Sequence, residues 1–284
     1  MSLSQRKSCH IAILGGTGKM GTLIAIFLKT DGFHVTIWGR KPEKTKRIAK
    51  KIGVYSAPII EKIAANSDIV VVSVPIENTY VICQSAAKYM KQGAILVDIS
   101  SAKTGIADRL QRKLPKQIKY VSIHPLFGSQ IESLEGQNFV IIKGSDELSS
   151  RKIANYLKTK GANVTYLSVK DHDHAMASFQ ALHHFAMLSF LYAFLEQISE
   201  IKEPSKLTTN SLRLTLKSIR RILENLDAVT SIQINNPYTR EIISKYIRFT
   251  SEFNKKTPEE IISEIKAKIQ ILQSSKEYRK LLGY

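Results

Sequence analysis

The sequence has few cysteines, few acidic residues and no long apolar run. Its 284 residues include only two cysteines, Cys9 and Cys83, which lie in apolar segments without C-x-x-C spacing. We therefore expect buried, reduced thiols and no metal site. No stretch of about 18 apolar residues is present, so no membrane-spanning helix is expected. The N-terminus lacks the apolar core of a secretory signal, which indicates a cytoplasmic protein.

Acidic residues are scarce relative to basic ones. The chain has 24 Asp and Glu against 42 Lys and Arg, a formal net charge of +18. Such a charge suits a dinucleotide and an anionic small-molecule substrate, and it equally suits nucleic acid. The basic residues recur at helical intervals, without the interleaved aromatic residues typical of a surface that binds single strands. We interpret most of them as solvated helix faces and expect neither nucleic acid nor a membrane as partner.

A short apolar run near the N-terminus ends in a group of glycines. The run at 9–14 is followed by Gly15, and an amphipathic segment begins at Met20. The pattern G-x-G-x-x-G lies between them, and such a pattern between strand and helix is typical of dinucleotide binding. Its first glycine makes the turn, its second admits a pyrophosphate, and its third lets the helix pack closely. The cofactor-binding candidates are Gly16, Thr17, Gly18, Lys19, Met20 and Gly21.

The end of the next expected strand, at 34–38, distinguishes between two nicotinamide cofactors. NAD sites usually place Asp or Glu there to bind the ribose 2′-hydroxyl, whereas NADP sites offer Arg and omit the carboxylate. This sequence lacks the carboxylate and has Arg40 and Lys41. We therefore expect NADP to be preferred, with NAD as the alternative. Val74 and Pro75, which end a later apolar run, are further cofactor-binding candidates.

Apolar runs alternate with helical patterns through the first 168 residues. The runs at 68–75 and 94–99 are unbroken, as in strands buried on both faces of a parallel sheet. Further strands are expected at 119–124, 138–142 and 163–167. The pattern predicts an α/β fold with a doubly wound, parallel Rossmann-type sheet of six or more strands. This sheet would form a dinucleotide-binding domain at 1–168.

Strand patterns stop after residue 168. The stretch 171–201 contains neither Gly nor Pro and is too apolar for a surface helix. Helical patterns follow at 207–226, 237–254 and 258–282, with prolines near helix starts. We expect an all-helical second domain at 169–284 that binds substrate. It would also form a homodimer, because two copies can bury apolar surface that one cannot.

Two expected strand ends carry polar side chains where α/β proteins bind ligands. The first, at 98–103, contains Ser101 and Lys103, although its serines could simply cap a helix. The second, at 124–128, places His124 before a proline. That imidazole could be structural, or it could accept a hydroxyl proton near a nicotinamide. In the second case, the rate would rise with pH through an ionisation near neutrality.

Three motifs together resemble the prephenate/arogenate dehydrogenase family of tyrosine biosynthesis. They are Gly16-Thr17-Gly18-Lys19-Met20-Gly21, Asp98-Ile99-Ser100-Ser101-Ala102-Lys103 and His124-Pro125-Leu126-Phe127-Gly128. In the helical half, His172-Asp173 followed by His184 is similar to the first helix of the family's second domain. Arg213-Leu214 with Arg221 resembles its substrate-binding helix. The resemblance covers about residues 11–234.

The resemblance implies oxidative decarboxylation of prephenate to 4-hydroxyphenylpyruvate, with hydride transfer to NAD(P). His124 would accept the hydroxyl proton, and Ser101 would orient both that hydroxyl and His124. Arg221 would bind a carboxylate of the dianionic substrate, which suits the two-donor fork of a guanidinium. His184 would line the same pocket. Two further candidates for substrate binding, Lys103 and Arg213, could equally be structural.

Three alternatives stay open. Arogenate could replace prephenate as the substrate. Another NADP-dependent oxidoreductase, of hydroxyacid or deazaflavin type, would account for the glycines and Arg40 but not for His124, His172 and His184 together. A non-catalytic NADP-sensing or nucleic-acid-binding protein would account for the net charge.

Overall fold

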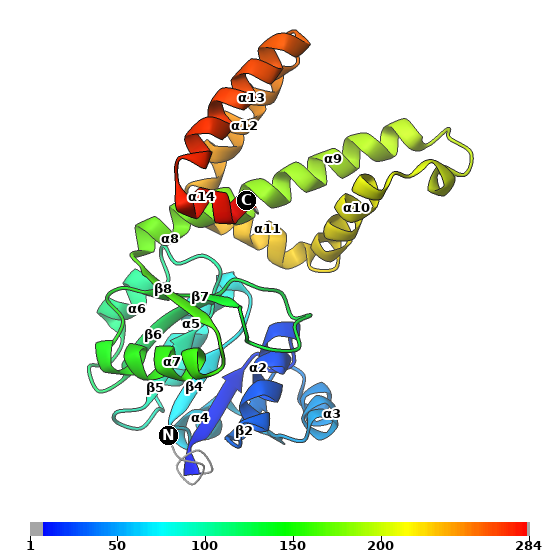
Figure 1. The fold of residues 1–284 in the computed structure, drawn as a ribbon. Coiled ribbons are helices and arrows are strands. Elements are labelled where there is room, and N and C mark those ends of the chain that lie inside the picture. The colour runs from blue at the N-terminus through cyan, green and yellow to red at the C-terminus, as the bar shows by residue number, and fades with distance from the viewer. Residues whose placement is uncertain (1–7, 283–284) are drawn as a thin grey trace. The chain divides into compact units, whose positions relative to one another are not determined.

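The structure is a computed structural model of the chain and describes residues 8–282. The chain forms two compact units, Met1–Thr239 and Arg240–Tyr284. The first contains an eight-stranded sheet in the order β3-β2-β1-β4-β5-β6-β7-β8, followed by helices (Figure 1). The predicted α/β class with a Rossmann-type sheet and a helical continuation is thereby confirmed.

The sheet is parallel except at one pair of strands. The strands are β1 (His10–Leu14), β2 (His34–Trp38), β3 (Tyr55–Ser56), β4 (Ile69–Val72), β5 (Ile95–Asp98), β6 (Lys119–Pro125), β7 (Asn138–Ile142) and β8 (Asn163–Leu167). Only β6 and β7 pair in the antiparallel direction. The seven strands expected from sequence are present, while β3 was not predicted. It has two exposed residues, too few for an apolar pattern.

Helices separate the successive strands of the first unit, except β6 from β7, and then follow one another after β8. They are α2 (Lys19–Thr30), α3 (Pro42–Ile52), α4 (Ile60–Ala65), α5 (Ile76–Ala87), α6 (Ala107–Lys113), α7 (Glu147–Thr159), α8 (Val169–Met176), α9 (His183–Ile198), α10 (Asn210–Leu223) and α11 (Leu226–Asn235). A π-helical stretch, Ala177–Leu182, joins α8 to α9, and a 3₁₀ turn, Pro204–Leu207, precedes α10. The apolar stretch at 171–201 is therefore helical throughout most of its length, as its lack of Gly and Pro predicts.

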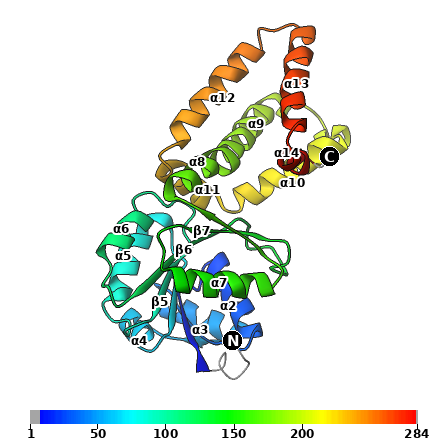
Figure 2. The same cartoon turned by 60° about the vertical axis from the view of Figure 1, so that its left-hand side comes forward.

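Helices cover both faces of the sheet (Figure 2). One buried cluster joins the sheet to α4, α5 and α6, and includes Leu14 of β1 and Val72 of β4. The other joins it to α2, α3 and α7, and includes Ile13 and Val71. Neighbouring residues of one strand point to opposite faces, so the unbroken apolar runs supply both clusters.

The helical pattern expected at 207–226 is divided in the structure. Helix α10 ends at Leu223 and α11 begins at Leu226, so α11 is an additional element. Between them, the Asn225 side chain donates from Nδ2 to the carbonyl oxygen of Arg221 at 2.9 Å. Such bonds from side chain to backbone compete with helix continuation, which accounts for the break.

The second unit consists of α12 (Thr239–Phe253), α13 (Pro258–Gln273) and α14 (Lys276–Leu282). Helix α13 begins with a capping box of Thr257 and Glu260, and Pro258 occupies its first turn. None of the helices described between residues 8 and 282 is long and apolar enough to cross a membrane. The sheet ends with β8 at Leu167, while the domain boundary between 168 and 169 stays a prediction.

Candidate active site

The predicted site residues from the sheet follow the carboxyl ends of its parallel strands. The glycine loop follows β1, Arg40 follows β2, Val74 and Pro75 follow β4, Ser101 and Lys103 follow β5, and His124 lies near the end of β6. The strand order reverses between β1 and β4. Ligands of open α/β sheets bind in the crevice at such a reversal. The topology therefore gathers these residues along one edge of the sheet.

Three glycines of the loop are required by the packing of the protein itself. Gly15 has φ +90°, and a Cβ there would lie 2.2 Å from the carbonyl oxygen of Ser73. A Cβ at Gly16 would lie 2.5 Å from Cβ of Ile37. A Cβ at Gly21 would lie 2.4 Å from the carbonyl oxygen of Gly15, so only glycine lets α2 pack against the turn.

Gly18 differs from these three because no contact among residues 8–282 requires it to be glycine. A Cβ there would meet its nearest atom, the carbonyl oxygen of Gly15, at an ordinary 3.4 Å, and φ is −79°. Gly18 is the N-cap of α2, where the first N–H groups of the helix lack intrahelical partners. A missing side chain at this point leaves space for a phosphate against those N–H groups. The loop therefore fits the diphosphate of a dinucleotide.

Lys19, a predicted cofactor-binding residue, bonds two groups within the protein. Its ammonium group donates to the carbonyl oxygen of Glu224 at 2.6 Å and to Oδ1 of Asn225 at 3.0 Å. Both acceptors lie just beyond the end of α10. The structure therefore bonds this residue of the glycine loop to the helix that carries Arg221, and Met20 beside it is half-buried.

The loops after β2 and β4 border the glycine loop. A Cβ at Gly39 would lie 2.7 Å from the Thr17 side chain, which places Arg40 near the glycine turn. Arg40 and Lys41 are exposed, and Arg40 makes no ion pair within residues 8–282. Cγ1 of Val74 would lie 3.0 Å from a Cβ at Gly15, so the loop containing Val74 and Pro75 also borders the turn.

His124 is a buried histidine with one ring nitrogen bonded to a second histidine. His124 belongs to β6, and its exposed fraction is 2%. Nδ1 of His124 lies 2.8 Å from Nε2 of His172 on α8. Burial, followed by the charges of His172 and Lys103, holds the pKa of His124 well below 6.5. The ring is therefore neutral at physiological pH.

A carboxylate completes this chain of side chains. Oδ1 of Asp173 lies 2.7 Å from Nδ1 of His172, and both residues are fully buried. Burial raises the pKa of Asp173, but hydrogen bonds from His172 and Thr104 outweigh it, so the pKa lies below 3.8. An ionised carboxylate only accepts, so Nδ1 of His172 carries a proton and its Nε2 accepts from His124. Nε2 of His124 is then left with a free lone pair, as a general base requires.

Ser101 and Lys103 differ in exposure and in bonding. Ser101 is half-buried, and its hydroxyl makes no hydrogen bond within residues 8–282. The ring of His124 is thus oriented by His172 rather than by Ser101. Lys103 is fully buried in an ion pair with Asp98 at 2.9 Å. For Lys103 the structure favours the structural alternative over a contact with substrate.

The arginines of α10 face different surroundings. Nη2 of Arg221 would lie 4.0 Å from a Cβ at Gly128, in the loop that follows His124. The neighbouring Arg220 bonds Glu224 at 3.2 Å and its side chain is 81% exposed. Arg213, about two turns earlier, is exposed and makes no ion pair within the described part of the chain. Only Arg221 is thereby brought close to the loop at 124–128.

His184 follows the π-helical stretch and keeps one polar atom without a partner. Its Nδ1 is buried and makes no hydrogen bond with any described residue, and the same holds for Oε1 of Gln180. Burial, with a smaller effect of His183, lowers the pKa of His184 to about 4. π-Helical turns occur frequently at functional sites. Gln180 was not predicted, since an isolated glutamine has no sequence pattern.

Comparison with known proteins decides the family. The family model for the prephenate dehydrogenase nucleotide-binding domain matches residues 24–166. The chain belongs to the prephenate dehydrogenase family. A probable arogenate/prephenate dehydrogenase of Methanocaldococcus jannaschii is 31% identical over 86% of this chain and 56% of its own length. The NADP(+) prephenate dehydrogenase of Saccharomyces cerevisiae is 25% identical over 88% of this chain and 57% of its own.

The solved structures of the family share the fold. The prephenate dehydrogenase of A. aeolicus, solved with hydroxyphenyl propionate and NAD+, has a TM-score of 0.74 at 18% identity. The match covers 94% of this chain and 98% of that one. By contrast, the chain spans about half the length of the curated relatives that it matches. The family and the fold are thus shown, and both nicotinamide cofactors occur in the names of these relatives.

Sequence reasoning named His172 and Asp173 only as part of the family resemblance and gave them no role. The structure places them directly behind His124. An adjacent His-Asp pair at a helix start was the available signal, because a carboxylate beside an imidazole can fix its tautomer. Its partner His124 is 48 residues away in sequence, and no local pattern links the two.

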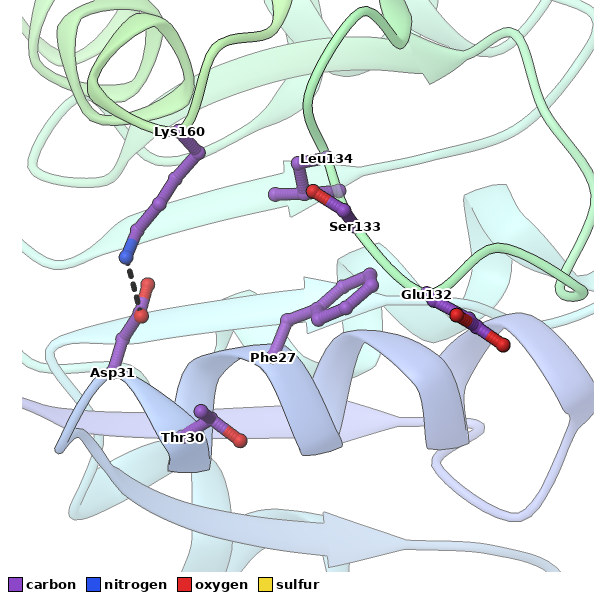
Figure 3. Close-up of a pocket in the computed structure, with 7 residues that line it drawn as sticks. All are labelled: Phe27, Thr30, Asp31, Glu132, Ser133, Leu134 and Lys160. Atoms are coloured by element: carbon purple, nitrogen blue, oxygen red, sulfur yellow. Dashed lines mark hydrogen bonds and ion pairs between the residues drawn. The ribbon is translucent and has the colours of Figure 1, made fainter.

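A separate cleft of about 160 Å³ lies at the carboxyl end of α2 (Figure 3). It is lined by Phe27, Thr30, Asp31, Glu132, Ser133, Leu134 and Lys160. Lys160 forms an ion pair with Asp31 on one side of it. The glycine loop is at the opposite end of α2, so this cleft is not part of the candidate site. Within residues 8–282, no three His, Cys, Asp or Glu side chains converge as metal ligands do.

Proposed function

We propose that this chain catalyses the oxidative decarboxylation of prephenate to 4-hydroxyphenylpyruvate, with hydride transfer to NAD(P), in tyrosine biosynthesis. The observation that carries the proposal is the buried chain of His124, His172 and Asp173. It leaves one imidazole nitrogen unprotonated near the sheet edge where the glycine loop fits a dinucleotide. A carbon that bears a hydroxyl group can lose hydride readily only as that hydroxyl loses its proton, which His124 would accept.

His124 would take one proton from the substrate and later return it to the same oxygen. Nε2 of His124 would take the hydroxyl proton, while its Nδ1 stays bonded to His172, which the Asp173 carboxylate orients. A bound nicotinamide would supply the acceptor for the hydride that leaves the carbon bearing this hydroxyl. As carbon dioxide leaves, the electron pair of the broken bond flows into the ring and onto the oxygen. His124 then returns the proton to that oxygen, so the phenol forms with no net proton released.

Three further residues would hold the substrate. Arg221, near Gly128, would bind a substrate carboxylate through two parallel hydrogen bonds. The half-buried Ser101 hydroxyl would orient the ring hydroxyl of the substrate. The buried, unpartnered Nδ1 of His184 would find its partner in the bound ligand. Arg213 stays a weaker candidate on the same helix as Arg221.

Arogenate is the second candidate substrate. It carries the same ring hydroxyl and ring carboxylate as prephenate and differs in having an amino group in place of the side-chain keto group. The base chain would serve both molecules equally. The name of the M. jannaschii relative includes both activities, which supports keeping both substrates in the proposal.

NADP is the proposed preferred cofactor. Exposed Arg40 follows β2 without an ion-pair partner in the described chain, and no carboxylate takes the position that would bind the ribose 2′-hydroxyl. Arg40→Asp should weaken NADP binding about tenfold or more and leave NAD binding equal or improved. Lys44→Asp, an equal charge change on α3, is the matched control. Equal losses for both cofactors in Arg40→Asp would contradict the assignment.

The enzyme is proposed to act as a homodimer through its helical part. Helix α9 is strongly apolar yet has no buried residue in the single chain. Tyr192 and Leu195 are 70% and 53% exposed. A second copy that covers this face would remove apolar surface from water, which is favourable by about 25 cal/mol per Å². In this arrangement residues 1–168 bind the cofactor, while residues 169–284 bind the substrate and the partner copy.

The proposed setting is the cytoplasm. Cys9 and Cys83 are free and buried, as the sequence predicts, and such thiols suit a reducing compartment. The proposed partners are a small anionic substrate and a second copy of the chain. Nucleic acid and membranes are not proposed as partners.

Absorbance of the reduced nicotinamide tests the proposal directly. The purified chain should reduce NADP with prephenate or arogenate and should be inactive on a panel of small hydroxyacids. Reduction with only a hydroxyacid would favour the other oxidoreductase class. A chain that turns over none of them but binds DNA with a steep salt dependence would favour the non-enzymatic alternative.

A further inference from the structure

Lys103 has the largest fully buried side chain among residues 8–282. Its ammonium nitrogen lies 2.9 Å from Oδ1 of Asp98 and 2.8 Å from the carbonyl oxygen of Ile123, the residue before His124. A third acceptor, Oγ of Ser100, lies at 3.4 Å. All three protons of the ammonium group therefore have acceptors within the protein, and none is left for a substrate.

The main chain of Lys103 contacts the other end of the base chain. Its N–H donates to Oδ1 of Asp173 at 3.0 Å, and the N–H of Thr104 donates to Oδ2 at 2.7 Å. The same residue thus holds the strand beside His124 and the carboxylate that orients His172. We infer that Lys103 is a positioning residue that fixes both ends of the base chain and keeps a second positive charge off His124. This inference rests on the proposed function.

The charge of Lys103 acts on His124 from inside the protein. The titratable groups around His124 and this ion pair are His172 and Asp173 on α8, Lys103 and Asp98 at the end of β5, Tyr120 on β6 and Cys83 on α5. Burial lowers the pKa of Lys103 from 10.5, and the Asp98 carboxylate opposes that change. Because all three protons of the Lys103 ammonium group have acceptors, Lys103 carries its positive charge. This charge near His124 disfavours a second positive charge on the His124 ring. His124 is thereby kept in the neutral form that a base needs.

The paired substitution Asp98→Asn with Lys103→Met tests this inference. It removes both buried charges together, so neither is left unpaired. We expect the plateau kcat to fall about tenfold, because the strand at Ile123, beside His124, loses the ammonium group that anchors it, whereas the main-chain bonds to Asp173 remain. The acidic limb of the rate profile should move up by about one pH unit, with KM unchanged. Titration of the His124 ring by NMR in the free protein, assigned with His124→Asn, should show the same upward shift.

Tyr120→Phe is the matched control within the same buried network. The Tyr120 hydroxyl donates to Oδ2 of Asp98 at 2.6 Å, so the substitution removes a hydrogen bond but no charge. We expect a lower Tm, with the acidic limb and the NMR titration unmoved. Because the NMR titration needs no substrate, it stands even if the enzyme acts on something other than prephenate or arogenate.

Two results would overturn the inference. If the paired variant has a lower Tm, but neither the acidic limb of its rate profile nor the NMR titration of His124 moves, Lys103 is merely structural. A tenfold rise in KM with an unmoved limb would make it a substrate ligand instead. If the paired variant does not fold, Asp98→Asn with Lys103→Gln keeps a hydrogen bond between two amides and is judged by the same results.

Discussion

The central strands and helix α9 bury their side chains in opposite ways. In β1, β4 and β5 every residue except the first is buried, whereas α9 has no buried residue at all. His124 and its two partners lie in or directly against the buried part. Arg221 and the apolar face of α9 lie on exposed helices. The groups that fix the protonation of His124 are therefore held by a buried core, whereas the groups proposed to meet a ligand or a partner copy lie on exposed helices.

The strongest test of the buried half is His124→Asn. Loss of the base should lower kcat by about 10²-fold to 10⁴-fold and change KM little, because the proton transfer occurs in the transition state. Steady-state kinetics would measure both constants. His174→Asn, on the exposed face of the same helix as His172, should keep the activity of the unmodified chain. A wild-type rate in His124→Asn would remove this residue from the mechanism.

The rate profile of the unmodified chain should be flat across neutrality. The sequence led us to expect an ionisation near pH 7, but burial and the charges of His172 and Lys103 hold the pKa of His124 well below 6.5. A base works when neutral, so kcat should fall only as the pH drops well below 6.5. The limb should be absent in His124→Asn. A limb centred near pH 7 would contradict the buried, charge-surrounded ring.

A negative charge on the exposed apolar face of α9 should dissociate the proposed dimer. Leu195→Glu puts a carboxylate on the apolar face of α9, and we expect the dissociation constant to rise about 10²-fold or more. Sedimentation velocity over a range of concentrations would measure it. Gln197→Glu adds the same charge at an exposed polar position of the same helix and should leave association nearly unchanged. A chain that is monomeric before any substitution would contradict the proposal.

The two neighbouring arginines of α10 should differ in their effect on substrate binding. Arg221→Lys should raise the KM for prephenate about tenfold, roughly 1.4 kcal/mol, because lysine lacks the planar two-donor fork. Cofactor affinity should be unchanged. Arg220→Lys should be near neutral, since Arg220 is an exposed partner of Glu224. If Arg220→Lys proves damaging and Arg221→Lys silent, the assignment of the clamp is wrong.

His184 supplies the smallest effect, which appears in stability. Its pKa is lowered from 6.5 to about 4, so the unfolded chain takes up this proton first. Stability should therefore fall as the pH drops from 6.5 towards 4, by about 1 kcal/mol after allowance for solvent screening. Urea unfolding at pH 7 and pH 5 would measure the difference, and His184→Gln should reduce it. His183→Gln, at the exposed neighbour, should reduce it far less, because burial of His184 is the larger cause of its lowered pKa.

The sequence is informative wherever a pattern is local. Unbroken apolar runs predict β4 and β5 because both faces of those strands are buried, and the glycine spacing predicts the turn after β1. The antiparallel pairing of β6 and β7 leaves no such pattern, because both strands are apolar whichever way they run. The two alternatives for Lys103 stayed open in the sequence for a related reason. A lysine after a strand looks the same in sequence whether it faces solvent or a buried carboxylate.

The hydrogen bonds between distant segments could not be predicted from local patterns. His124 and His172 meet only because β6 and α8 lie together in the fold. Lys19 bonds Glu224, which is 205 residues away in the sequence. Such contacts depend on how whole elements pack, which periodicity and spacing do not encode. The residue types of the site could therefore be named in advance, while the partners that set their protonation could not.

The bonds of Lys19 connect two binding events. Lys19 donates to Oδ1 of Asn225, and Asn225 donates to the carbonyl oxygen of Arg221, so two hydrogen bonds separate the glycine loop from the proposed clamp. A cofactor that shifts Lys19 on binding would change the free energy of binding at Arg221. By thermodynamic linkage, the substrate would then change the affinity for the cofactor by the same factor. The dissociation constant of the cofactor, measured with and without substrate, would give this coupling as a single free energy.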